Sequence, residues 1–133
     1  MSAYATVQTQ FRDQQALVQA LGEIGYAEVE VHAEAQALYG YHGDVRPEKA
    51  HVIVRRQHVG QAANDVGFVR GQDGTFQAIV SAYAGLRPFT AEKQKQLRQR
   101  YACCALKVEA AKNGWKVAET KLDDGRVKLT VRR

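Results

Sequence analysis

Residues 39–83 read YGYHGDVRPEKAHVIVRRQHVGQAANDVGFVRGQDGTFQAIVSAY. Short apolar runs alternate in this segment with loops that are rich in glycine, histidine, arginine and acidic residues. Runs of this length between turn signals are typical of buried strands. The tight-turn signal GQDG separates the runs at 66–70 and 75–83, so we expect these two runs to form a hairpin. The segment therefore predicts a sheet, and it does not by itself indicate a reaction.

The residues on either side of this segment predict further strands and two helices. Asp13 and Thr90 are the expected N-caps of the helices, and Gly25 and Asn113-Gly114 are the expected stops. A final hairpin turns at Asp123-Asp124-Gly125, with Val127, Leu129 and Val131 on one face of its second strand. The predicted order is β-α-β-β-β-β-β-α-β-β, with the first six strands at 4–11, 27–33, 36–41, 51–56, 66–70 and 75–83.

The predicted fold class is α+β. Most connections are too short for parallel crossovers, so the sheet is expected to be largely antiparallel with two helices packed on one face. We expect Pro47 and Pro88 to lie in loops. The 133 residues are expected to form a single domain, 1–133, which is long enough to bury a core without a disulfide or a metal.

Charge is distributed unevenly along the chain. The net charge is +5, but residues 1–50 carry three basic and seven acidic side chains, whereas residues 51–133 carry sixteen basic and seven acidic ones. If the two parts form different surfaces, one face of the protein is basic and attracts acidic partners. The N-terminal residues show no signal peptide, and no apolar run approaches the ~20 residues of a membrane helix. We therefore expect a cytoplasmic protein that does not enter a membrane.

No arrangement of residues points to a metal, a cofactor or a nucleophile. The four histidines, His32, His42, His51 and His58, form no HxH or HExxH spacing. Cys103 and Cys104 are neighbours in a helical pattern, so we expect one in the core and one at its edge. The glycine-containing stretches GYHGD and GQDG match no phosphate-binding loop. The sequence therefore predicts no metal and no cofactor, and it favours a protein without enzyme activity over an enzymatic alternative.

The main candidate for a functional site is a polar cluster on either side of the predicted strand 51–56. Arginine binds carboxylate or phosphate through a planar fork of donors, and a neighbouring aromatic ring can stack on it. Such a cluster can bind an anion or an acidic partner. Alternatively, its acids and amide cap turns through bonds to the backbone while its arginines face water. The candidate binding residues are Tyr41, His42, Asp44, Arg46, Arg55, Arg56, His58, Asn64 and Asp65.

Three stretches resemble a known family: MSAYATVQTQF at 1–11, YGYHGDVRPEKAHVIVRR at 39–56 and NDVGFVRGQDGTFQAIVSAY at 64–83. They resemble the plastid open reading frame thirty-five family, which contains cyanobacterial and plastid-encoded conserved hypothetical proteins with a domain of unknown function. The likeness covers the whole chain, including GWKV at 114–117. The chain departs from the family at Ala3 and Tyr4, where MSHF is common, and at Ala82, where an acid is common.

The resemblance implies a soluble accessory protein with no established enzyme activity and no catalytic residues to carry over. It implies a cytoplasmic location, or a stromal one in plastid relatives, and it adds weight to the segments 41–46 and 64–68.

Three functions remain open at this point. The first is a binding or assembly module that contacts an acidic protein partner through a basic face; unpaired strand edges also make a homodimer possible. The second is binding of RNA or DNA phosphates by Arg55, Arg56, Lys93, Lys95, Arg98 and Arg100. The third is an enzyme acting on a phosphorylated or carboxylated small molecule near His42, Asp44, Arg55 and His58.

Overall fold

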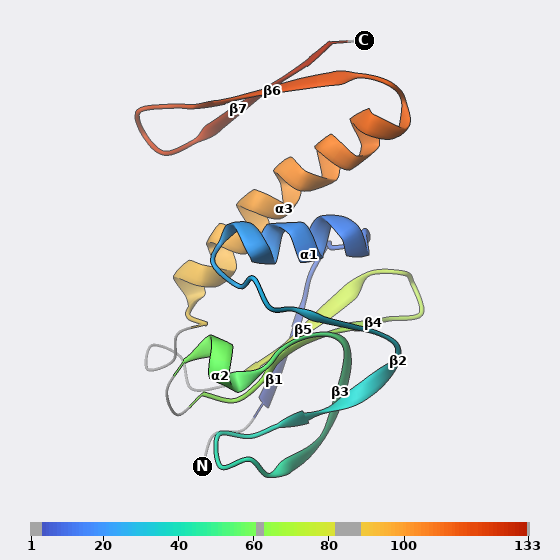
Figure 1. The fold of residues 1–133 in the computed structure, drawn as a ribbon, viewed down its shortest axis with the longest axis vertical. Coiled ribbons are helices and arrows are strands. Elements are labelled where there is room, and N and C mark those ends of the chain that lie inside the picture. The colour runs from blue at the N-terminus through green and yellow to red at the C-terminus, as the bar shows by residue number, and fades with distance from the viewer. Residues whose placement is uncertain (1–3, 61–62, 82–88, 133) are drawn as a thin grey trace.

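A computed structural model describes residues 4–60, 63–81 and 89–132 of the chain. These residues form a five-stranded antiparallel sheet, a layer of helices on that sheet, and a two-stranded hairpin on the other side of the helices (Figure 1). The predicted α+β class and the antiparallel sheet are confirmed. The elements are β1 (Tyr4–Gln8), α1 (Gln14–Glu23), β2 (Glu30–Tyr39), β3 (Val45–Val54), α2 (Arg56–Val59), β4 (Val66–Arg70), β5 (Phe76–Ser81), α3 (Ala91–Lys112), β6 (Lys116–Lys121) and β7 (Val127–Arg132).

The two long helices begin at the predicted caps. The Asp13 carboxylate accepts a hydrogen bond from the Ala16 amide at 2.9 Å, and the Thr90 hydroxyl accepts one from the Lys93 amide at 3.3 Å. Each bond satisfies a backbone donor that the first turn of a helix leaves free. Gly25, which follows α1, has a positive φ of 114°, a conformation that few residues other than glycine adopt.

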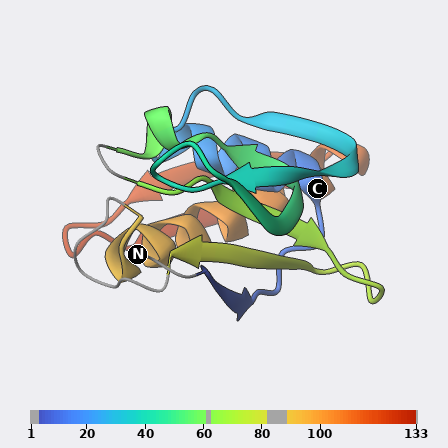
Figure 2. The same cartoon turned by 90° about the horizontal axis from the view of Figure 1, so that it is seen from below.

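The main core lies between the sheet and helices α1 and α3. The strand order is β1-β5-β4-β3-β2, with β1 and β2 at opposite edges (Figure 2). Leu17 and Leu21 of α1 are fully buried, and full burial of a leucine contributes about 1.5–3 kcal/mol. The sheet residues on this face include Val52, Val54, Phe68, Phe76, Ala78 and Val80, and α3 adds Leu97 and Cys104.

A smaller core lies on the opposite face of the sheet and is formed mainly by residues of β2 and β3. It contains Leu38, Ala50, Ile53 and Ile79. Gly67 of β4 lies against this core, and a Cβ atom placed on it would be 2.6 Å from the Ala50 Cβ. Gly67 is therefore required for close packing, and not for an unusual backbone angle.

The structure corrects several details of the predicted elements. The strands expected at 27–33 and 36–41 are one strand, β2, whose pairing with β3 shifts register between Val31 and Gln36. Pro47 lies in β3 and not in a loop. A third helix, α2, occupies residues expected to end a strand and begin a loop. Cys103 and Cys104 are both buried, so neither is at the edge of the core. Pro88 lies outside the described residues.

The C-terminal hairpin forms a sheet of its own. Strands β6 and β7 pair in regular antiparallel register from Lys116 opposite Arg132 to Lys121 opposite Val127, which confirms the predicted hairpin. The hairpin packs on α3, so it belongs to the far side of the helix layer and not to the main sheet (Figure 1). A two-stranded sheet is stable only when another element supports it.

Candidate functional site

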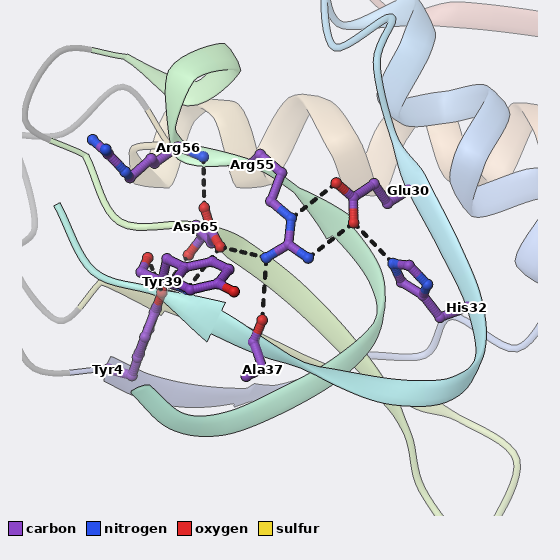
Figure 3. A network of polar contacts seen from close by, with 8 residues as sticks. All are labelled: Tyr4, Glu30, His32, Ala37, Tyr39, Arg55, Arg56 and Asp65. Carbon is purple, nitrogen blue, oxygen red and sulfur yellow. Dashed lines mark hydrogen bonds and ion pairs between the residues drawn. The ribbon is translucent and has the colours of Figure 1, made fainter. Parts of the chain in front are cut away.

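The polar cluster is organised around the guanidinium group of Arg55, which lies just after β3 (Figure 3). Its Nε and Nη2 donate to the two carboxylate oxygens of Glu30, each at 2.9 Å. Its Nη1 donates to Asp65 Oδ2 at 2.8 Å and to the Ala37 carbonyl at 3.1 Å. The Tyr39 ring lies 5.2 Å from the guanidinium carbon. One cation is therefore held by two carboxylates, a carbonyl and an aromatic face.

Asp65 connects three separate segments of the chain. Its side chain is only 1% exposed. Besides the Arg55 guanidinium, its carboxylate accepts the Tyr39 amide at 2.7 Å and the Arg56 amide at 2.6 Å (Figure 3). The Arg56 amide is the first of helix α2, so Asp65 satisfies a free donor at that helix end. Its own carbonyl accepts the Tyr4 hydroxyl at 2.8 Å.

The ion pair changes the acidity of its members. The hydrogen bonds from Arg55 hold the pKa of Glu30 below its ordinary value, and the bonds to Glu30 raise the pKa of Arg55. Burial raises the pKa of Tyr4, whose hydroxyl donates into the same region. Because two carboxylates face Arg55, this residue does not offer a net positive charge to an anion.

The loop between β2 and β3 lies beside the segment that precedes β4. The Tyr41 amide donates to the Asn64 side chain at 2.9 Å, and Arg56 Nη1 donates to the Tyr41 carbonyl at 3.3 Å. The His42 ring lies 4.0 Å from the Tyr41 ring. Within the same loop, Asp44 forms an ion pair with Arg46 at 3.6 Å. The two loops that the sequence singled out therefore share one region of the molecule.

The predicted binding residues in this region differ in burial, from the buried Asn64 and Asp65 to the exposed His42, Asp44 and His58, with the other four in between. Asn64 and Asp65 are buried and bond to backbone groups of neighbouring segments, as the alternative interpretation of turn capping expects. His42 and His58 are exposed, the latter on α2. Whether these nine residues bind a ligand stays a prediction. Sequence reasoning missed Glu30 and Tyr39, whose only signal was their place on alternating strand positions.

A second candidate surface is the outer face of the C-terminal hairpin. The cross-strand register puts Lys116 opposite Arg132 and Thr120 opposite Lys128. Residues directly opposite each other point to the same side, so these side chains share one face. All six residues of this outer hairpin face are exposed, and none is acidic: Lys116, Ala118, Thr120, Lys128, Thr130 and Arg132.

The inner face of the hairpin holds it on α3. Glu119 accepts from Arg100 at 3.2 Å and from Lys107 at 2.8 Å, and both donors belong to α3. These bonds lower the pKa of Glu119 to about 2. Arg100 also bonds to Glu23 of α1 at 2.6 Å. The Glu119 carboxylate is therefore used internally, and it does not balance the cations of the outer hairpin face.

Several residues that were candidates for binding phosphates are engaged within the protein. Arg55 and Arg100 form the ion pairs above, and Lys93 donates to the Ile24 carbonyl at 3.0 Å. Lys95 and Arg98 of α3 are exposed. The phosphate candidates that stay exposed therefore lie on α3, and the hairpin adds the exposed cations Lys116, Lys128 and Arg132.

Within the described ranges, no group of three His, Cys, Asp or Glu side chains is placed to hold a metal ion. In the same part of the chain, no helix is both long and apolar enough to cross a membrane.

Comparison with known proteins yields one match. No curated protein and no solved structure matches the chain. A family model described as "Protein of unknown function (DUF1257)" matches residues 20–130, which include the nine candidate binding residues and all of the outer hairpin face except Arg132. The chain belongs to the DUF1257 family.

Proposed function

We propose that this chain is a small soluble accessory or assembly protein, without enzyme activity of its own, that binds an acidic protein partner through the outer hairpin face. The observation that supports the proposal is the charge of that face, which combines three exposed cations with no acid. Like charges placed directly opposite each other, as Lys116 and Arg132 are, destabilise a strand pair. An acidic partner removes that cost when it binds.

A protein partner fits this surface better than a single-stranded nucleic acid. Proteins that bind single-stranded nucleic acid combine basic side chains with exposed aromatic rings on which bases stack. The other residues of the outer hairpin face are alanine and threonine, so it offers no ring. The resemblance to cyanobacterial and plastid-encoded proteins supports a cytoplasmic or stromal location for the interaction.

The test compares two variants that lose the same charge. K116Q/K128Q/R132Q neutralises the outer hairpin face, whereas R12Q/K49Q/R70Q neutralises three exposed cations outside the hairpin. Tagged wild-type protein and both variants are used to capture partners from a native lysate, with and without nuclease. We expect the hairpin variant to lose the captured protein, the control variant to retain it, and nuclease to have no effect.

Two results would contradict the proposal. Equal capture by the hairpin variant and by wild type would exclude the outer hairpin face as the binding surface. Loss of all captured material after nuclease treatment would assign the basic face to nucleic acid, and binding would then fall steeply with salt.

A further inference from the structure

We propose that β1 pairs with β1 of a second copy, so that two chains form one continuous antiparallel sheet. This inference concerns the sheet edge, which is separate from the hairpin. It follows from a difference between the two edge strands of the main sheet, β1 and β2 (Figure 2).

The edge formed by β2 is protected against pairing. Its register with β3 shifts between Val31 and Gln36, and this irregularity bends the strand. Two acidic side chains lie at this irregularity, Glu30 just before it and Glu34 within it. Bulges and charges are the devices by which natural proteins prevent edge-to-edge contact.

The edge formed by β1 has none of these devices. Its sequence, YATVQ, contains no charged residue and no proline. All five residues pair with β5 in regular register, from Tyr4 opposite Ser81 to Gln8 opposite Gln77. Among the described residues, no strand pairs with the outer side of β1. As far as the described residues show, the strand is therefore free of bulges, neutral and open to a further strand.

The surface beside β1 also favours a second copy. Val7 is 36% exposed. It borders a small groove between β1 and α3, whose lining includes Phe11, Phe89 and Leu97. In an antiparallel pair of identical strands, the two-fold axis is perpendicular to the sheet, so both helix layers lie on the same side. The Val7 side chain and the groove of each chain then face those of the other chain across the axis.

A second copy suits this edge better than a charged peptide does. The side chains of β1 add no like-charge repulsion to the contact, although each chain carries a net charge of +5 and Arg98 lines the groove beside the strand. Because β2 is protected, the main sheet of each chain offers one open edge among the described residues, and the two-fold contact uses that edge of both copies. The assembly therefore closes as a dimer and does not extend into a fibre.

The test places two lysines on one edge or on the other. T6K/Q8K adds them to exposed positions of β1, and the matched control A33K/Q36K adds them to exposed positions of β2. Molar mass is measured by light scattering over a wide range of concentrations, with circular dichroism to confirm that each variant is folded. We expect wild type and A33K/Q36K to reach twice the chain mass, and T6K/Q8K to remain at the chain mass.

Three results would overturn the inference. The first is a wild-type protein that keeps the mass of one chain up to the highest soluble concentration. The second is a folded T6K/Q8K variant that still has twice that mass. The third is dissociation of A33K/Q36K to the same extent as T6K/Q8K, which would indicate a nonspecific effect of added charge.

Discussion

Substitution of Asp65 by asparagine tests whether the Arg55 network holds the loops together. The carboxylate accepts three hydrogen bonds, from the amides of Arg56 and Tyr39 and from the Arg55 guanidinium. Asparagine retains one acceptor oxygen and replaces the other with an NH₂ group, which cannot accept. In either orientation of the amide, at least one buried donor faces another donor.

The expected loss of stability follows from these contacts. A buried donor left without a partner costs about 1–3 kcal/mol, and removal of one charge from a buried ion pair adds to that cost. Arg55 keeps its two bonds to Glu30, which limits the loss. We therefore expect D65N to lower the free energy of unfolding by about 1–3 kcal/mol.

The assay is urea denaturation followed by circular dichroism, with D123N as the matched control. Asp123 is exposed in the hairpin turn, so its substitution removes the same charge with an expected change within about 0.5 kcal/mol. The slope of the unfolding transition is compared as well, because an unchanged slope indicates that the folded state is intact. A loss below about 1 kcal/mol for D65N would refute the structural role given to this carboxylate.

Three further predictions concern single residues. Gly67→Ala should lower the free energy of unfolding by about 1–3 kcal/mol, because the added methyl group meets the Ala50 side chain. Gly22→Ala, whose methyl group enters open space on α1, should instead raise the free energy of unfolding by up to about 1 kcal/mol. Chemical denaturation of both variants measures the difference, and equal effects would contradict the prediction. Cys104 should resist alkylation at pH 8 until the protein unfolds, because burial and a hydrogen bond to the Glu23 carboxylate raise its pKa to about 11. Mass spectrometry that finds Cys104 rapidly alkylated in the folded protein would show this prediction to be wrong. His51 should titrate below its ordinary pKa of 6.5, because burial and the nearby Arg70 lower the pKa. Acidification below pH 6.5 then protonates His51 in the unfolded state first, which destabilises the folded state. An NMR titration midpoint of His51 at or above 6.5 would contradict this prediction.

Much of the fold could be predicted because its signals are local. The caps of α1 and α3 and the turns of the two later hairpins depend on a few neighbouring residues, such as Asp13 and Thr90, and all were predicted correctly. The course of β2 could not be predicted, because its alternation breaks where the pairing shifts register and a break in alternation is also the signature of a turn. Pro47 was misplaced for a similar reason: it lies in a stretch of β3 where the pairing with β2 is irregular, and such positions tolerate proline.

The candidate site depended on contacts between distant segments. The sequence placed Arg55 and Asp65 among the candidate binding residues. Glu30, however, is 25 residues from Arg55 and contacts it only because β2 and β3 pair. Whether an arginine is free or already paired depends on that register, which a single sequence does not fix. The face on which the basic residues of the hairpin lie was easier to predict, because alternation along the strand alone assigned Lys128 and Arg132 to one face.

The position of β1 in the sheet has a consequence for synthesis of the protein. Tyr4 pairs with Ser81, so the first strand made cannot find its partner until the chain has been extended beyond residue 81. At a synthesis rate of about 5–20 residues per second, this wait lasts roughly 4–15 s. Strands β2 to β5 can pair with one another as they emerge, because each pairs with the strand that follows it. The first strand of the main sheet to leave the ribosome is therefore the last that can be added to it.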